Sequence, residues 1–388
     1  MAVLATQSRV ARSIAVVGAL LLLTVALRDE RRHVIAAKER AHAFALADAW
    51  FAEARALRCP RPALREPAIG DGSPLLRFML DRKSVEAKCL SAISGIPDLL
   101  TLKKLSDLPP HPEIVEQCAA LYADIDGVAR ATEACSPMRA ANFDFRSFDP
   151  TSSVSMFLLN YAVGFRVAPL VAEGRLADAA RHVIDSMRFA QDSARGTFLL
   201  GSMLGVALIE RLANTLDEIL GDPRLTPQEA RAIAHDLDVL IATQPSIDET
   251  IHQEVIATTH AVMSDGDEVA VPAILSQERW LHDFERACSR VPMSECVERL
   301  DTNDQRSFIM AEYIRKMASA ETPLRAARMQ AELRTLDGHC GNAAQQHARL
   351  APLQGETILL GNVVLQPPWT IGRYQHSRHP HFLRCVDY

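Results

Sequence analysis

The stretch TPQEARAIAHDLDVLI, residues 226–241, shows most directly how this chain folds. It begins with a capping box, in which Thr226 stands three residues before Glu229, and Pro227 occupies the first helical position. Apolar residues then recur at helical spacing on one face, at Ala230, Ile233, Leu237 and Leu240. A helix with one apolar face needs partner helices, so the stretch predicts a packed helical body.

The same periodicity extends through most of the chain. A second capping box runs from Ser246 to Glu249, and prolines and glycines separate helical stretches at intervals of roughly 20 to 25 residues. Further helices are predicted at 75–93, 111–134, 152–172, 175–194, 198–220, 247–264, 271–288, 303–319 and 322–337. Short connections favour antiparallel neighbours. The sequence therefore predicts a mainly α fold of stacked antiparallel helical hairpins, arranged as a solenoid or a bundle.

The composition is that of an ordinary globular protein. The chain has 388 residues, of which 48% are hydrophobic and 23% charged, with a formal net charge of −6. These values exclude a disordered or collagen-like chain. Nucleic-acid binding depends on Lys and Arg at phosphates, and no dominant basic block occurs, so we expect no nucleic-acid partner.

A charge-free apolar run lies near the N-terminus, where residues 13–27 read SIAVVGALLLLTVAL. It ends against the charged block 28–32, as targeting and anchoring segments do. The run is shorter than the roughly 20 residues that span a bilayer, which favours a signal peptide cleaved after Ala26. No glycine or proline occurs from Arg28 to Arg58, which favours one helix leaving the membrane uncleaved. We predict that residues 1–27 are a signal anchor.

Two rules predict different sides of the membrane for the body. Lys and Arg are more numerous just after the apolar run than before it, and the positive-inside rule then favours a cytoplasmic body. An even number of cysteines behind an export-like segment favours disulfides and an oxidising compartment. We expect a single-pass inner-membrane protein with a periplasmic body. A cytoplasm-facing protein with free thiols is the alternative.

Eight cysteines are candidates for disulfides: Cys59, Cys89, Cys118, Cys135, Cys288, Cys296, Cys340 and Cys385. The simplest pairing joins sequence neighbours, which are Cys59 with Cys89 and Cys288 with Cys296. Cys118 and Cys135 lie at the two ends of one predicted helix, too far apart for a bond, so Cys118 could instead cross to another helix. A bridge between Cys340 and Cys385 is the preferred interpretation of the tail.

The stretch after the apolar helix 156–171 begins with Gly174-Arg175-Leu176 and continues with small or apolar residues at helical spacing, at Ala179, Val183 and Met187. It resembles one degenerate tetratricopeptide hairpin, in which small residues lie where paired helices cross. No second copy follows at the family's period. The resemblance therefore implies helical-hairpin packing and says nothing about ligands. The layout of anchor, helical body and tail also resembles signal-anchored α-helical envelope proteins of Gram-negative bacteria, which implies no activity.

Few residues point to chemistry. His235, His252 and His260, with nearby carboxylates, are the one cluster that an enzyme site assembled between helices would use. Glu249 and His252 have the Glu-x-x-His spacing of di-iron bundles, but the chain has no second copy. Histidines and cysteines also gather toward the C-terminus, at His339, Cys340, His347, His376, His379, His381 and Cys385. Arginines interleave with the tail histidines and the spacing fits no zinc family, so we predict neither metal nor cofactor.

The remaining motifs concern packing and boundaries. Gly201 and Gly205 form a Gly-x-x-x-Gly pair, which lets two helices approach closely. Residues 142–148 alternate aromatic and polar side chains like a strand or linker, and 358–365 fit a short β-hairpin. We divide the chain into the anchor 1–27, a helical region 28–150, a helical-hairpin body 151–350 and a tail 351–388.

With no nucleophile–base pair or cofactor loop in view, a non-catalytic role is the favoured interpretation. The sequence predicts a membrane-anchored scaffold that presents a helical surface to another envelope protein. The alternative is the enzyme with the histidine site described above.

Overall fold

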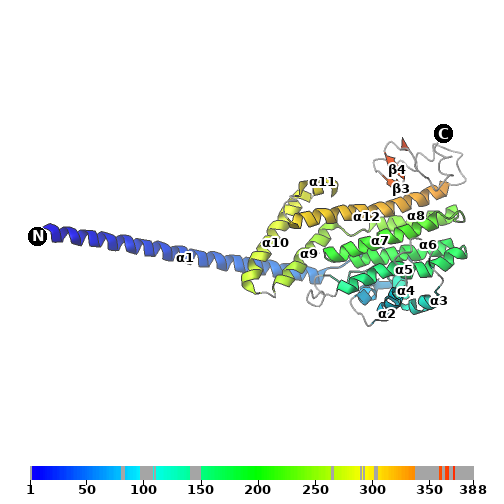
Figure 1. Cartoon of the computed structure of the whole chain (residues 1–388), viewed down its shortest axis with the longest axis horizontal. Coiled ribbons are helices and arrows are strands. Elements are labelled where there is room, and N and C mark those ends of the chain that lie inside the picture. The colour runs from blue at the N-terminus through cyan, green and yellow to red at the C-terminus, as the bar shows by residue number, and fades with distance from the viewer. Residues whose placement is uncertain are drawn as a thin grey trace.

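The computed structural model describes residues 2–79, 84–96, 108, 111–139, 150–263, 266–288, 291, 293–300, 305–336, 358–360, 363–366 and 370–371. The protein is mainly α-helical, as the periodicity predicts (Figure 1). The residues 142–148, Cys340, Cys385 and the tail histidines lie outside this described part.

Helix α1 (Ala2–Ala56) is unbroken from the N-terminal apolar run to the body. Its first part projects away from the other helices, and its last part lies against α9 (Ile247–Met263) and α10 (Asp267–Cys288) (Figure 1). Every described side chain from 28 to 42 is exposed, and we call this segment the stalk. Burial begins at Ala43 and continues at Ala47, Trp50 and Ala54, which form one helical stripe.

The region after α1 contains two short strands that the sequence pattern did not predict. Strand β1 (Ile69–Asp71) pairs in parallel with β2 (Ala131–Glu133), with Ile69 opposite Ala131. The predicted helices 75–93 and 111–134 are each divided. The first becomes η1 (Ser73–Met79) and α2 (Val85–Ser94), and the second becomes α3 (Pro112–Gln117) and α4 (Ala119–Arg130). Cys118, between α3 and α4, is fixed by a disulfide to α2, which explains the second break.

The centre of the body is built from three consecutive helices, α5 (Pro150–Ala172), α6 (Leu176–Ala194) and α7 (Leu199–Leu220). Helices α5 and α6 form the hairpin that the tetratricopeptide-like stretch predicts, with Gly174 in the turn at φ +77°. Ala179, Val183 and Met187 are fully buried in it. Helix pairing alone is shown here, since one hairpin does not establish a repeat family.

Close packing between α6 and α7 depends on Gly205. A Cβ there would lie 2.6 Å from Ala194 Cβ and 2.7 Å from the Ala190 carbonyl oxygen, both in α6. Gly205 therefore acts as the sequence predicts, whereas the atoms nearest a Cβ at Gly201 belong to Thr197, just before the same helix. Helix α7 is also long and apolar enough to cross a membrane, but 56% of its most apolar window is buried inside the body. We interpret it as a core helix.

The second layer consists of α8 (Pro227–Ala242) and α12 (Gln305–Leu336), which pack on each other and on α6 or α7 (Figure 1). The capping box of Thr226 and Glu229 is formed in full. Helix α12 runs through Pro323, where the sequence predicts two helices, because packing along α7 and α8 offsets the lost backbone hydrogen bond. The short α11 (Met293–Arg299) joins α10 to α12.

Near the C-terminus, β3 (Ile358–Leu360) and β4 (Val363–Gln366) pair antiparallel, with Leu360 opposite Val363, and β5 (Thr370–Ile371) adds a third strand. The main core is one continuous apolar cluster that includes side chains from α1 to α12. The boundaries at 27, 150 and 350 stay predictions.

Candidate functional site

Six of the cysteines are placed in three disulfides, and each disulfide joins different segments. The pairs are Cys59–Cys135, Cys89–Cys118 and Cys288–Cys296. Pairing of sequence neighbours is therefore wrong for Cys59, although Cys118 does cross to another helix. The long-range pair brings residues 76 apart in sequence together, because β1 and β2 lie side by side next to it.

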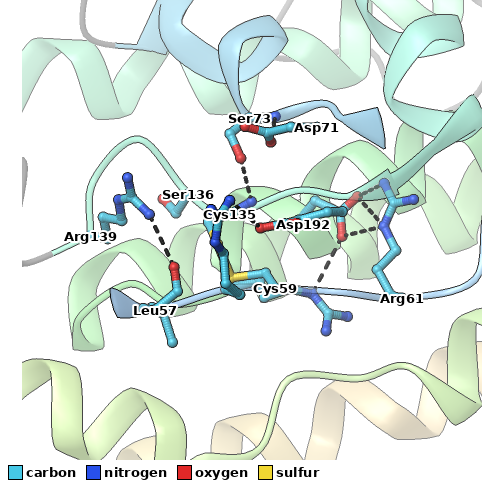
Figure 2. Close-up of a disulfide and its surroundings, with 12 residues drawn as sticks. Leu57, Cys59, Arg61, Asp71, Ser73, Cys135, Ser136, Arg139 and Asp192 are labelled. Carbon is cyan, nitrogen blue, oxygen red and sulfur yellow. Dashed lines mark hydrogen bonds and ion pairs between the residues drawn. A yellow bond between two sulfur atoms is a disulfide. The ribbon is translucent and has the colours of Figure 1, made fainter. Parts of the chain in front are cut away.

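The Cys59–Cys135 disulfide anchors the segment that follows α1 to the segment that follows β2 (Figure 2). The backbone N–H of Cys135 donates to Ser73 Oγ at 2.8 Å, and that of Ala134 donates to the Cys59 carbonyl at 3.2 Å. Gly196 lies against the bond at φ +68°, where a Cβ would lie 2.7 Å from Leu57 Cδ2. The disulfide is buried, so it braces the core and is shielded from reductants.

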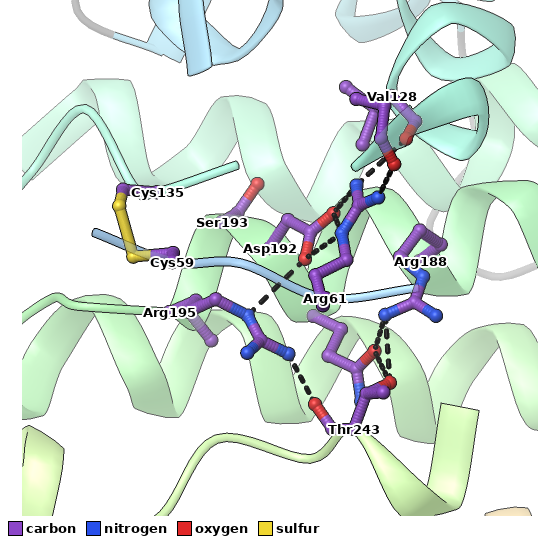
Figure 3. A network of polar contacts seen from close by, with 12 residues as sticks. Cys59, Arg61, Val128, Cys135, Arg188, Asp192, Ser193, Arg195 and Thr243 are labelled. Carbon is purple, nitrogen blue, oxygen red and sulfur yellow. Dashed lines mark hydrogen bonds and ion pairs between the residues drawn. A yellow bond between two sulfur atoms is a disulfide. The ribbon is translucent and has the colours of Figure 1, made fainter. Parts of the chain in front are cut away.

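A buried ion pair lies beside this disulfide (Figure 3). The side chains of Arg61 and Asp192 are 1% and 0% exposed. Arg61 donates from Nε to Asp192 Oδ2 at 3.1 Å, and from its terminal nitrogens to Asp192 and to the Val128 and Ala131 carbonyls. A guanidinium with this many acceptors holds the chain after α1, the end of α4 and helix α6 together.

Two further arginines, Arg188 in α6 and Arg195 just after it, extend the network toward the end of α8 (Figure 3). Arg195 Nε is 3.4 Å from Asp192 Oδ1, and its terminal nitrogen donates to the Thr243 carbonyl. Arg188 donates to Gln191 Oε1 and Thr243 Oγ1, both at 2.8 Å, while its Nε and second terminal nitrogen have no hydrogen-bond partner. Burial lowers the pKa of Arg188 to about 10, so it stays charged at neutral pH.

A second cluster of charges, one arginine with two carboxylates, includes Asp185 of α6 and Asp236 of α8. Arg65 contacts Asp185 at 2.8 Å and Asp236 at 2.5 Å, so it links the N-terminal region to α6 and α8. Burial raises the pKa of Asp185 to about 6, against the attraction of Arg65. The charged side chains of this network are nearly all enclosed by helices, so we assign them to bracing the fold. Sequence reasoning did not identify any of them.

The raised pKa of Asp185 predicts a pH-dependent stability. An ordinary Asp titrates near 3.8, so the folded state binds the proton more tightly, and stability falls as pH rises from about 4 to about 6. The loss is up to about 3 kcal/mol. Asp185→Asn should remove this fall, so the variant gains stability relative to wild type across that interval, measured by urea unfolding. Asp178→Asn, at an exposed pair on the same helix, should show no such gain. A wild-type-like profile in Asp185→Asn would contradict the assignment.

The predicted histidine cluster is only partly assembled. His252 lines a pocket of about 590 Å³ between α9 and α10, together with Asp248, His282, Glu285 and Arg286 among others. His260 packs its ring edge-on against Phe51 of α1 with centroids 5.7 Å apart, and His235 is exposed on α8. The three histidines therefore do not line one site, which corrects the arrangement that the enzyme interpretation requires.

The Glu-x-x-His spacing does not form a site either. Glu249 is half-buried near Arg195 and Gly196, and this partial burial raises its pKa. His252 instead faces Glu53 and Glu285. Within the described residues, no three His, Cys, Asp or Glu side chains are grouped as a metal ion requires.

The comparisons with known proteins give no guidance on function. No protein-family model, no curated protein and no solved structure matches the chain. The arrangement itself offers two polar sites: an enclosed charge network that substrates do not reach, and an open histidine–carboxylate pocket where α1 meets the α9–α10 hairpin.

Proposed function

We propose that the protein is a single-pass membrane-anchored scaffold, with its helical body in the periplasm and a surface for an envelope protein partner. The observation that carries the proposal is the unbroken helix α1, which joins the apolar run 13–27 to the buried stripe from Ala43 to Ala54. Because one helix is both the anchor and part of the core, it fixes the distance and orientation of the body relative to the membrane.

The stalk supports this role. At 1.5 Å per residue, residues 28–42 hold the body about 22 Å beyond the end of the apolar run. Charged residues cover most of the stalk, as a helix in water requires. A body carried at this height is free to contact partners on several sides.

The disulfides and the buried network support a rigid, extracytoplasmic body. Disulfides persist in oxidising compartments and are rare in the cytosol. Three of them brace the segment that follows α1, the junction of α2 with α3 and α4, and the connection from α10 to α11, and an Arg–Asp pair lies beside Cys59–Cys135. A restrained body suits a scaffold because its binding surface is organised before the partner arrives.

The test is thiol alkylation of the protein in intact cells, with and without reduction, combined with the mass of the mature N-terminus. We expect thiols that react only after reduction, and an N-terminus that retains residues 13–27. Freely alkylated thiols would overturn the periplasmic location and favour the cytoplasm-facing orientation. A chain that begins near Leu27 would overturn the anchor, since the body would then be released.

A further inference from the structure

The junction between α1 and the α9–α10 hairpin depends on small apolar contacts. Ala43, Ala47 and Ala54 supply most of the buried stripe of α1 and Trp50 is its one large member, while Leu46 and Phe51 pack against the core only partly buried. Alanine buries little apolar area, so most of the fully buried positions of α1 each contribute little to its docking. Polar contacts across the junction then have a larger share in holding it.

Two of those polar contacts use histidine. His42 of α1 places Nε2 3.1 Å from both carboxylate oxygens of Glu278 in α10. Glu53 of α1 places Oε1 3.3 Å from Nδ1 of His252 in α9. Arg40 of α1 also pairs with Asp267 at the start of α10. Imidazole as a class has a charged and a neutral form between pH 5 and 8, so a histidine contact differs from a contact between a guanidinium and a carboxylate.

His252 lies between two carboxylates. Its Nδ1 faces Glu53, and its Nε2 is 3.7 Å from Glu285 Oε1 in α10. A neutral imidazole has one N–H, so one of the two carboxylates then faces a nitrogen lone pair. The doubly protonated ring presents an N–H to both and links α1, α9 and α10.

The other charged groups around His252 do not reverse this preference. His282 Nδ1 is 3.6 Å from the second oxygen of Glu285, and Asp248 and Arg286 line the same pocket. Arg286 pairs with Asp283 on its own helix. Around His42, the neighbouring Arg40 is paired with Asp267.

We infer that this junction is a proton-operated latch. When His42 and His252 carry a proton on both ring nitrogens, α1 is held more tightly against the hairpin, and loss of those protons loosens it; imidazole side chains as a class change charge between pH 5 and 8. The sign follows from charge: the pairs are ion pairs only while the imidazoles are protonated, so docking weakens as pH rises. The biological use of the latch rests on the proposed periplasmic location of the body, because that compartment is exposed to external pH. The contacts of the latch themselves do not depend on location.

The experiment is hydrogen exchange, followed by mass spectrometry, on the full chain in detergent micelles with EDTA. The readout is the protection factor of amides 43–56 in α1, corrected for intrinsic exchange at each pH. We expect on the order of tenfold stronger protection at pH 5.5 than at pH 7.5, since two partly exposed pairs gain charge. Amides of α6 serve as the internal reference. Asp185 in that helix makes global stability depend on pH, so a change in protection that α1 and α6 share reports global stability and not the junction.

The variants separate the latch from general stability effects. His42→Gln with His252→Gln should remove the pH dependence in α1, and His235→Gln, an exposed histidine of α8, should retain it. The double variant Glu53→Gln with Glu278→Gln keeps both histidines and removes their carboxylate partners across the junction. It should therefore also remove the pH dependence of protection in α1. If the histidine double variant loses protection in α6, it is destabilised globally, and the glutamate double variant then provides the test of the latch.

Equal wild-type protection at the two pH values would overturn the latch, and so would a pH dependence that survives in both double variants. Neither result bears on cellular location, so failure of the latch and failure of the anchored-scaffold proposal are distinguishable.

Discussion

Replacing Asp192 by Asn is expected to lower the free energy of unfolding by about 3 to 5 kcal/mol. The carboxylate is fully buried and accepts from Arg61, with Arg195 also adjacent. Asn leaves the Arg61 charge buried without its counter-charge, and Arg188 and Arg195 add repulsion. The measurement is urea unfolding of the full chain in micelles, followed by circular dichroism.

Asp178→Asn is the matched control. It removes the same charge from the same helix, but its Arg175 pair is exposed, so a loss of at most about 1 kcal/mol is expected. Replacing Arg61 by Met and Asp192 by Leu together should recover part of the stability that Asp192→Asn loses, because Arg61 is then no longer stranded, while Arg188 and Arg195 still lose the neighbouring carboxylate. Equal effects of Asp192→Asn and Asp178→Asn would contradict the buried-pair assignment.

Removing the Cys59–Cys135 bond by a double substitution to Ala should cost about 4 to 5 kcal/mol, the second large effect expected. The bond closes a loop between residues 76 apart, so its loss gives the unfolded chain a large gain in conformational entropy. The midpoint of urea unfolding, measured under non-reducing conditions, should fall accordingly.

The Cys288–Cys296 bond provides the comparison, since it spans only 8 residues. Its double Ala variant is expected to lose about 2 to 3 kcal/mol in the same model of loop entropy. If the two variants lose the same stability, loop closure is not what makes the long-range bond effective.

Local sequence signals identify the helices well and the short strands poorly. Capping at Thr226, apolar spacing in α8 and the Gly201–Gly205 pair are contained within single segments, so their outcome follows from nearby residues. Strands β1 and β2 have three residues each and pair across 62 positions. No local pattern encodes such pairing, and the same holds for the continuity of α12 through Pro323, which depends on α7 and α8.

The burial of the charged residues of α6 could not be predicted from each residue taken alone. Charged residues are expected at the surface, yet Asp185, Arg188 and Asp192 are buried. One signal was present in the sequence: opposite charges recur every three or four residues from Asp185 to Arg195, on a helix whose other faces are apolar or small. The partners Arg61 and Arg65, more than 100 positions away, follow only from the tertiary fold.

With the apolar run 13–27 in a bilayer, as proposed above, the unbroken α1 also fixes the rotation of the body about the helix axis relative to that bilayer. Each residue of an α-helix advances the chain by 1.5 Å and turns it by about 100°. Adding one residue to the stalk would therefore rotate the body by about 100°, whereas adding seven would raise the body by about 10 Å and restore its orientation to within about 20°. Stalk length is thus constrained in steps of seven residues when the direction of facing matters.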